Sequence, residues 1–114
     1  MSARERVQID ATLAALADPR RRQVVDILSE RPLAAGELAK AAGLTAPAMS
    51  RHLKVLRESG LVEEEHKGFD ARVRVYRLRA EPMTALKEWL EEAELLWTRQ
   101  LLAFKAHVEK AKKK

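Results

Sequence analysis

Two short amphipathic helices joined at a glycine are predicted by residues 35–60, which read AGELAKAAGLTAPAMSRHLKVLRESG. The first helix is expected over 35–42 and ends at Gly43, because glycine tolerates the left-handed backbone of a helix end. Thr45 is a good N-cap and Pro47 suits a first turn, so the second helix starts there and runs to about Ser59. This pattern predicts a helix-turn-helix.

The two faces of the second helix follow from helical spacing. Ala39 is small where the helices must cross closely, and the inner face is supplied by Leu44, Met49, Leu53 and Leu56. The outer face is small, polar or basic and consists of Thr45, Ala46, Ser50, Arg51, Lys54 and Arg57. In a helix-turn-helix this face enters the major groove, where small polar groups approach base edges and cations anchor phosphates. We therefore predict that it contacts DNA.

Some residues near this face have two interpretations each. Arg57 lies far from the amino end of its helix, so a solvated position is an alternative to a phosphate contact. His52 is expected either to reach a phosphate or to pack and hydrogen bond within the fold. One of the three arginines at 20–22 is expected to pair with an acid across helices or to bind backbone carbonyls, with direct DNA contact as the alternative. Asp18, just before Pro19, is interpreted as a helix N-cap.

Further elements are predicted on both sides of the helix pair. Apolar spacing indicates a helix over 7–17, followed by a second helix over about 19–29. The apolar face of the earlier one is formed by Ile9, Leu13 and Leu16. Residues 61–66 and 72–78 suggest two strands with a turn between them, which predicts a β-hairpin. A final helix opens at Pro82.

Three segments carry a family resemblance: LADPRRR at 16–22, GELA at 36–39 and PAMSRHLKVLRESGLV at 47–62. The chain resembles the ArsR/SmtB winged-helix transcriptional repressors from about residue 9 to residue 80. The resemblance implies a mainly α fold with a small β-hairpin, arranged as a winged helix-turn-helix. It further implies that the protein forms a homodimer. It also implies an inverted-repeat operator and autoregulation. The hairpin becomes the wing, whose cations Lys67, Arg72 and Arg74 are expected to touch phosphate or the adjacent minor groove.

The final helix, over 82–110, argues for the dimer. An apolar stripe recurs along it at spacings of three and four: Leu86, Leu90, Ala93, Trp97, Leu101, Phe104 and Val108. The helix would be roughly 43 Å long, whereas a compact domain of this size is only about 35 Å across. We predict that a second copy buries this stripe and Trp89, with Ile9 and Leu13 of residues 5–17 packing alongside. Packing within one protomer is the alternative.

Composition excludes several classes of protein. A length of 114 residues allows one domain, with a winged-helix core at 9–80 and the dimerisation helix at 82–110. The chain has no cysteine, which excludes disulfides, thiolate metal sites and thiol redox switches. Apolar runs are far shorter than a bilayer span, and the amino end lacks a secretory pattern. We expect no membrane contact and a cytoplasmic location.

Charge is distributed unevenly, although the net value is only +5. Residues 45–79 carry a basic surplus, residues 80–109 an acidic one, and the last five residues are basic again. A basic middle suits a polyanion, and an acidic helix after it suggests a second surface with a different role. The terminal lysines are expected to be a solvated end, with sequence-independent attraction to DNA as the alternative.

Metal and enzyme sites do not fit the residues. The resembled family places metal ligands near the helix before the recognition helix or in the last helices, where this chain offers little beyond Glu37 and His107. We expect neither a metal nor another cofactor. His52, His66 and His107 lie on separate elements without a partnering motif, so no enzyme is expected. A winged-helix module that binds protein instead of an operator is the remaining alternative. Whether the protein responds to a small molecule, to a partner protein or to no effector stays open.

Overall fold

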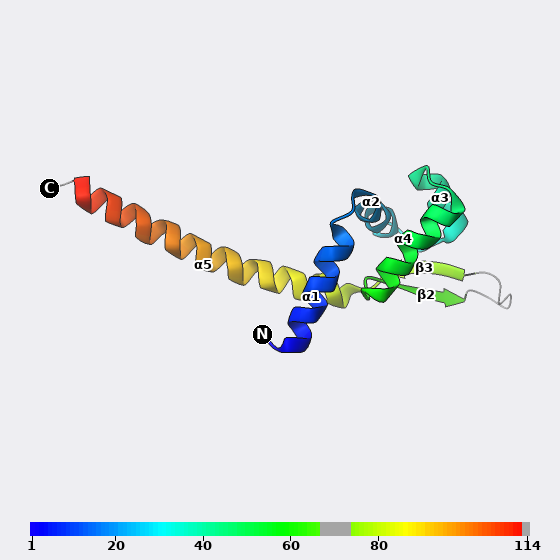
Figure 1. The fold of residues 1–114 in the computed structure, drawn as a ribbon, viewed down its shortest axis with the longest axis horizontal. Helices are drawn as coiled ribbons and strands as arrows, with labels where there is room; N and C mark the ends of the chain where they lie inside the picture. The colour runs from blue at the N-terminus through cyan, green and yellow to red at the C-terminus, as the bar shows by residue number, and fades with distance from the viewer. Residues whose placement is uncertain (67–73, 113–114) are drawn as a thin grey trace.

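The computed structural model describes residues 1–66 and 74–112, and Figure 1 shows a compact head from which one long helix extends. The elements in chain order are α1 (Ala3–Leu16), α2 (Pro19–Leu28), β1 (Leu33–Ala34), α3 (Ala35–Ala42), α4 (Ala46–Glu58), β2 (Val62–His66), β3 (Arg74–Leu78) and α5 (Ala80–Lys112). The predicted class, mainly helical with a small β-structure and a long final helix, is confirmed. No helix in the described ranges is both long enough and apolar enough to cross a bilayer.

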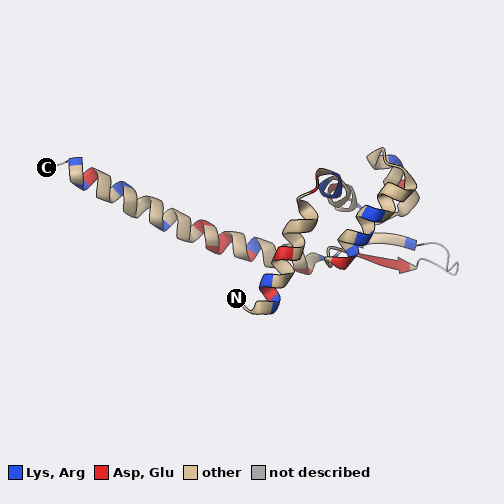
Figure 2. Ribbon diagram, in the orientation of Figure 1, with Lys and Arg blue, Asp and Glu red and all other residues tan. Residues whose placement is uncertain are grey.

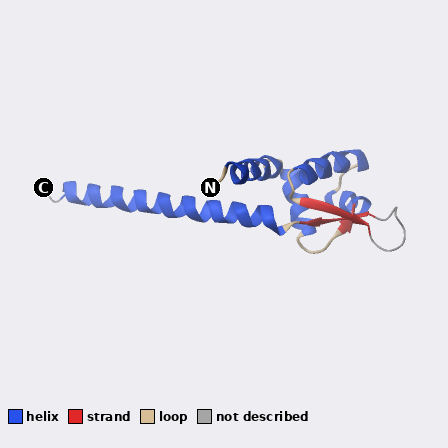
Figure 3. Cartoon of the chain, turned by 90° about the horizontal axis from the view of Figure 1, so that it is seen from below, coloured by secondary structure: helices blue, strands red, loops and turns tan. Residues whose placement is uncertain are grey.

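The sheet has three antiparallel strands in the order β1-β3-β2 (Figure 3). The predicted hairpin of β2 and β3 is present, and Glu64 lies opposite Tyr76 within it. β1 was not predicted, because two residues are too few to display an alternating pattern. It pairs Leu33 with Tyr76 and Ala34 with Val75, which anchors the start of α3 on the wing.

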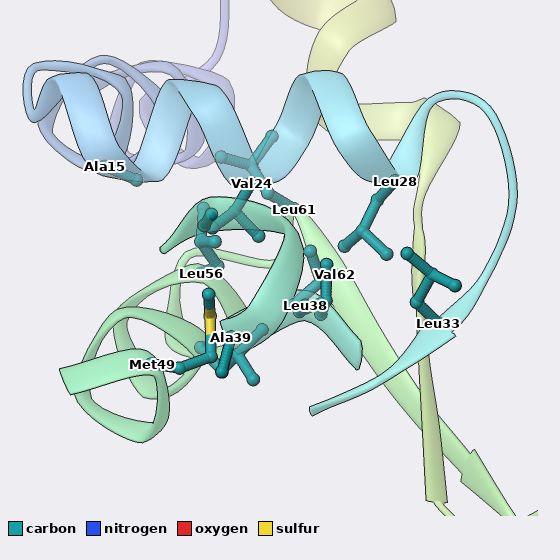
Figure 4. Close-up of a cluster of buried hydrophobic side chains, with 12 residues drawn as sticks. Ala15, Val24, Leu28, Leu33, Leu38, Ala39, Met49, Leu56, Leu61 and Val62 are labelled. Carbon is teal, nitrogen blue, oxygen red and sulfur yellow. The ribbon is translucent and has the colours of Figure 1, made fainter. Parts of the chain in front are cut away.

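The core lies between α2, α3, α4 and the sheet (Figure 4). The three helices contribute side chains with no exposed surface, namely Val24, Leu38 and Leu56, and Leu61 just before β2 is equally buried. Burying one such side chain stabilises the fold by about 1.5–3 kcal/mol. Ala39 is only 7% exposed at the crossing of α3 and α4, as its small size predicts. The core therefore holds α4 by its inner face and leaves the outer face free.

Three arginines at the start of α2 fix its junction with α1. Asp18 accepts a 2.7 Å hydrogen bond from the backbone N–H of Arg20, which confirms it as the N-cap. Arg21 donates from Nε to the carbonyl of Ala15 at 2.7 Å, and Arg22 likewise contacts the last carbonyls of α1. The prediction that one of these arginines binds backbone carbonyls is confirmed, and Arg20 likewise donates to the Ala42 carbonyl at the end of α3.

Helix α5 makes the molecule elongated. The radius of gyration is 20.1 Å, against about 13 Å for a compact chain of this size. α1 packs against the first half of α5, and the remainder extends away from the head (Figures 1 and 3). The face that α1 buries is formed by Ile9, Thr12 and Ala15. The expected face of Ile9, Leu13 and Leu16 is thus partly wrong, because Leu13 is 43% exposed.

Candidate nucleic-acid interface

The turn before α4 sets the orientation of this helix. Gly43 has a φ of 66°, and the N–H of Leu44 donates to the carbonyl of Ala39 at 2.9 Å. A Cβ at Gly43 would meet no atom within 4 Å, so the left-handed backbone, not crowding, is what requires glycine. The Thr45 hydroxyl then accepts from the N–H of Ala48 at 3.3 Å and caps α4. The amino end of α4 is therefore held firmly at the surface.

The predicted outer face of α4 is exposed. Thr45, Ala46, Ser50, Arg51 and Lys54 all lie in solvent, and Figure 2 shows basic residues along this helix. The amino half of α4 thus offers a small surface followed by cations, which suits base edges first and phosphates further along. Among the described residues, none bonds to the side chains of Ser50, Arg51 or Lys54.

His52 is turned partly toward the protein. It is half-buried. It lies near Asp18 at the start of α2, whose pKa is lowered first by the hydrogen bond from the N–H of Arg20 and least by His52. A phosphate contact by His52 stays a prediction, with a packing role as the alternative.

Glu64 on β2 joins the recognition helix to the wing. Its carboxylate contacts Arg57 of α4 at 2.7 Å and Arg74 of β3 at 3.1 Å, and its side chain is only 15% exposed. Tyr76 donates to the same carboxylate at 3.4 Å. Burial, and next the negative charge of Glu64, raise the pKa of Tyr76. One acid therefore pairs with two cations that the sequence suggested for phosphate contact.

The other charged side chains at the base of the wing are paired as well. Arg77 contacts Glu63 and lies 3.4 Å from Glu65, and Arg79 lies 3.7 Å from Glu63. The predicted wing cations Lys67 and Arg72 lie outside the described residues. In the part of the wing that the structure describes, the arginines of β3 are thus matched by the glutamates of β2.

The predicted dimer residues divide into two groups. Four are large and exposed: Leu90 (47%), Trp97 (60%), Leu101 (68%) and Phe104 (67%). Ala93 is half-buried. Ile9 and Leu86 are each only 6% exposed, because α1 and α5 cover them within the protomer. Almost nothing of these two side chains is left for a partner, so their assignment to the dimer interface is corrected to the protomer core.

Comparison with known proteins identifies the family. A sequence pattern described as "Bacterial regulatory protein, arsR family" matches residues 18–64. The chain is also 40% identical over 95 residues to the HTH-type transcriptional regulator Rv2034 of Mycobacterium tuberculosis, an alignment covering 83% of each chain. The protein belongs to the ArsR family. The resemblance predicted from the motifs is confirmed, and members of this family are transcription regulators, not enzymes.

Solved structures resemble this ArsR-family regulator along most of its length. An ArsR-like transcriptional regulator from Rhodococcus sp. RHA1 gives a TM-score of 0.81 at 27% identity, covering 96% of this chain and 98% of that one. A homodimeric winged helix-turn-helix DNA-binding domain from Mycobacterium bovis gives a TM-score of 0.61 at 26% identity, covering 82% and 88%. The winged helix-turn-helix architecture is thus shared.

Within the described residues, this ArsR-family regulator shows few side chains that could ligate a metal together. The sequence has no cysteine. Within 1–66 and 74–112, no group of three or more His, Asp or Glu side chains is arranged to hold a metal ion. Glu37 is occupied at the start of α3, where its carboxylate accepts from the N–H of Ala34 at 3.3 Å.

The contact of Glu64 with α4 was not predicted from the sequence of this ArsR-family chain, although the alternation of side chains along the strand indicates it. Side chains alternate along a strand, so Glu64 shares a face with Val62. Val62 is 2% exposed, and that face is turned toward α4. A glutamate two residues after a core valine is therefore directed at the recognition helix, where it meets Arg57.

Proposed function

We propose that this ArsR-family regulator binds a specific inverted-repeat operator as a homodimer and represses its own operon. The observation that carries the proposal is the outer face of α4. Ser50, Arg51 and Lys54 project into solvent without partners in the described part of the chain, from a helix whose amino end is capped by Thr45. Unpaired cations on a rigid helix have a clear use against a polyanion and little use on a protein-binding surface.

Each side chain on α4 then has a stated role. Ser50 and Arg51 specify bases, because they lie in the first turns, where a recognition helix approaches base edges most closely. Thr45 and Ala46 allow that close approach because they are small. Lys54, a turn further on, anchors a phosphate. Arg74 adds a phosphate contact from the wing when it leaves Glu64.

The exposed stripe of α5 supports the homodimer. Trp97, Leu101 and Phe104 are all at least 60% exposed in the protomer, which is unfavourable for side chains of this size. The Mycobacterium bovis relative is a homodimer as well. A twofold pair would present two copies of α4 to half-sites about 34 Å apart, one turn of duplex. The proposed place of action is the cytoplasm, where bacterial DNA lies.

The test is selection of bound fragments from random DNA by the purified protein, followed by Arg51→Ala on the selected sequence. We expect an enriched inverted repeat, with the same enrichment in chelator and in added zinc. Arg51→Ala should cost about 1–3 kcal/mol of binding and relax the preference at one base position.

Lys54→Ala is the matched control, because it removes a cation one turn along the same face. It should weaken binding about equally on all sequences and reduce the salt slope by about 1. If Arg51→Ala also weakened all sequences equally, Arg51 would be a phosphate anchor. If no fragment were enriched, operator binding would be refuted in favour of a protein-binding module.

A further inference from the structure

A hollow lies where the winged head meets α5. It has a volume of about 640 Å³ and opens to solvent. Its lining comes from the end of α2, the loop that leads to β1, the end of β3 and the start of α5. Sites for small molecules have volumes of about 300–1,000 Å³, so the hollow has the size of a ligand site.

Most of the lining surface is apolar. Leu28, Leu78, Ala80 and Met83 contribute to it. Leu28 is only 4% exposed and belongs to the core, whereas Met83 is 39% exposed. Covering apolar surface of this kind is favourable by about 25 cal/mol per Å². A ligand that fits the hollow therefore has an apolar body.

The charged side chains around the hollow are mostly basic. One acid, Glu30, lines it together with four cations, which gives a net charge of +3: Arg31, Arg77, Arg79 and Lys87. Three of these cations have acidic neighbours, because Arg77 and Arg79 contact Glu63 and Lys87 lies 3.8 Å from Glu91.

Arg31 differs from the other three cations. Its side chain is exposed in the loop between α2 and β1. Within residues 1–66 and 74–112, this guanidinium has neither an ion pair nor a hydrogen bond. A guanidinium binds a carboxylate through two parallel N–H donors, so Arg31 can hold the charged end of a ligand whose body lies in the hollow.

We propose that this hollow binds a small carboxylate with an apolar body, whose charged group lies on Arg31. A cation would meet the net charge of +3, and a neutral apolar molecule would gain nothing from Arg31. The inference goes beyond the proposed function, because it adds a ligand site that operator binding does not require.

A ligand in the hollow would also affect the wing. Arg77 pairs with Glu63 and Glu65 of β2, and a carboxylate beside it competes with those glutamates for the same guanidinium. The ligand adds one negative charge per protomer near the wing as well. Because DNA is a polyanion, the bound carboxylate should weaken DNA binding, a consequence that rests on the proposed function.

Calorimetric titration with sodium octanoate tests the site. We expect saturable binding of one octanoate per protomer and much weaker binding of octylammonium, which has the same chain and the opposite charge. Arg31→Gln should weaken octanoate binding about tenfold, because it removes the charge and the paired donors. Arg6→Gln is the matched control: it removes an exposed arginine that also lacks an ion pair in the described ranges, and it should bind octanoate like the wild type.

Thr84→Trp tests the hollow without changing any charge. Thr84 is exposed at the start of α5 and lines the hollow, so the indole should fill it and abolish octanoate binding, with a wild-type thermal midpoint. Unchanged binding in both Arg31→Gln and Thr84→Trp would place octanoate elsewhere and overturn the proposal. Equal binding of octylammonium, or no saturable binding at millimolar octanoate, would overturn it as well.

Fluorescence anisotropy on a DNA duplex tests the effect on the wing. Saturating octanoate should lower the DNA affinity of the wild type and leave that of Arg31→Gln much less changed. Unchanged affinity in the wild type would overturn the link to the wing. A wild-type protein that binds no DNA would instead refute the proposed function and leave the calorimetric result standing, so the two failures are distinguishable.

Discussion

Glu64→Gln should lower the stability of the protein and raise its affinity for DNA of any sequence. Glutamine keeps the size of the side chain but removes the charge that holds Arg57 at 2.7 Å and Arg74 at 3.1 Å. Both arginines are about half exposed, so the two ion pairs are worth only about 0.2–1 kcal/mol each after screening. We expect a loss of about 0.4–2 kcal/mol per protomer in urea unfolding.

The gain in DNA binding follows from the two arginines, Arg57 and Arg74, that the substitution releases. Each freed arginine that reaches a phosphate adds about 0.9 to the slope of log affinity against log salt. One such arginine per protomer steepens the slope of a dimer by about 1.8, and both steepen it by about 3.6. Non-specific DNA should gain more than the operator, because phosphate contacts carry no sequence information. Stability and affinity thus move in opposite directions, which partial unfolding does not produce.

The assay is fluorescence anisotropy on operator and random duplexes over a salt series. Glu58→Gln is the matched control, since it makes the same charge change near the end of α4 and frees no arginine among the described residues. A slope in Glu64→Gln no steeper than in this control would refute the idea that Glu64 withholds two cations from DNA. An absorbance titration adds a second check: the pKa of Tyr76 should fall in Glu64→Gln yet stay raised by burial.

Two further predictions concern stability. Asp18 has a lowered pKa, so its charge stabilises the fold above its ordinary value of 3.8, and this contribution is lost as pH falls through the folded value. Asp18→Asn keeps the cap, and its thermal midpoint should depend less on pH below 4 than that of the wild type. Gln8→Leu should cost about 1–3 kcal/mol in urea unfolding, since Gln8 Nε2 donates to the Ser59 carbonyl at 2.9 Å in a part-buried place. Unchanged stability would mean that water replaces the bond.

The fold was predictable because its turns and caps are local. Asp18, Gly43 and Thr45 fix helix ends through bonds to residues within five positions, and all three act as the sequence predicts. β1 depends on pairing with β3, some 40 positions away, and leaves no local periodicity. The buried face of α1 was misassigned for a related reason. Thr12 is polar and so does not belong to the apolar pattern, yet its hydroxyl donates to the Gln8 carbonyl at 2.9 Å and is satisfied in the core.

The candidate site was only partly predictable from the sequence. The exposure of side chains on α4 can be inferred from that helix alone, whereas their ion pairs depend on other elements. The outward positions of Ser50, Arg51 and Lys54 follow from helical period alone. The pairing of Arg57 and Arg74 depends on Glu64, which is distant from both in the sequence and is brought to them by the register of β2 with β3. Counting wing arginines therefore overestimates the charge available to DNA.

In the proposed dimer, the recognition helix and the interface helices would move as one body, because polar contacts join them at two places along α1. Near the middle of α1, Gln8 Nε2 donates to the Ser59 carbonyl at the carboxyl end of α4. At the carboxyl end of α1, Arg21 and Arg22 donate to the last backbone carbonyls of that helix. Arg20 donates to a carbonyl at the end of α3. A rotation of α1 within the dimer must therefore move α3 and α4 together or break these bonds. In the proposed homodimer, the distance between the two copies of α4 would be set by how α1 and α5 meet their partners, so a change at that interface would alter half-site spacing before it altered base preference.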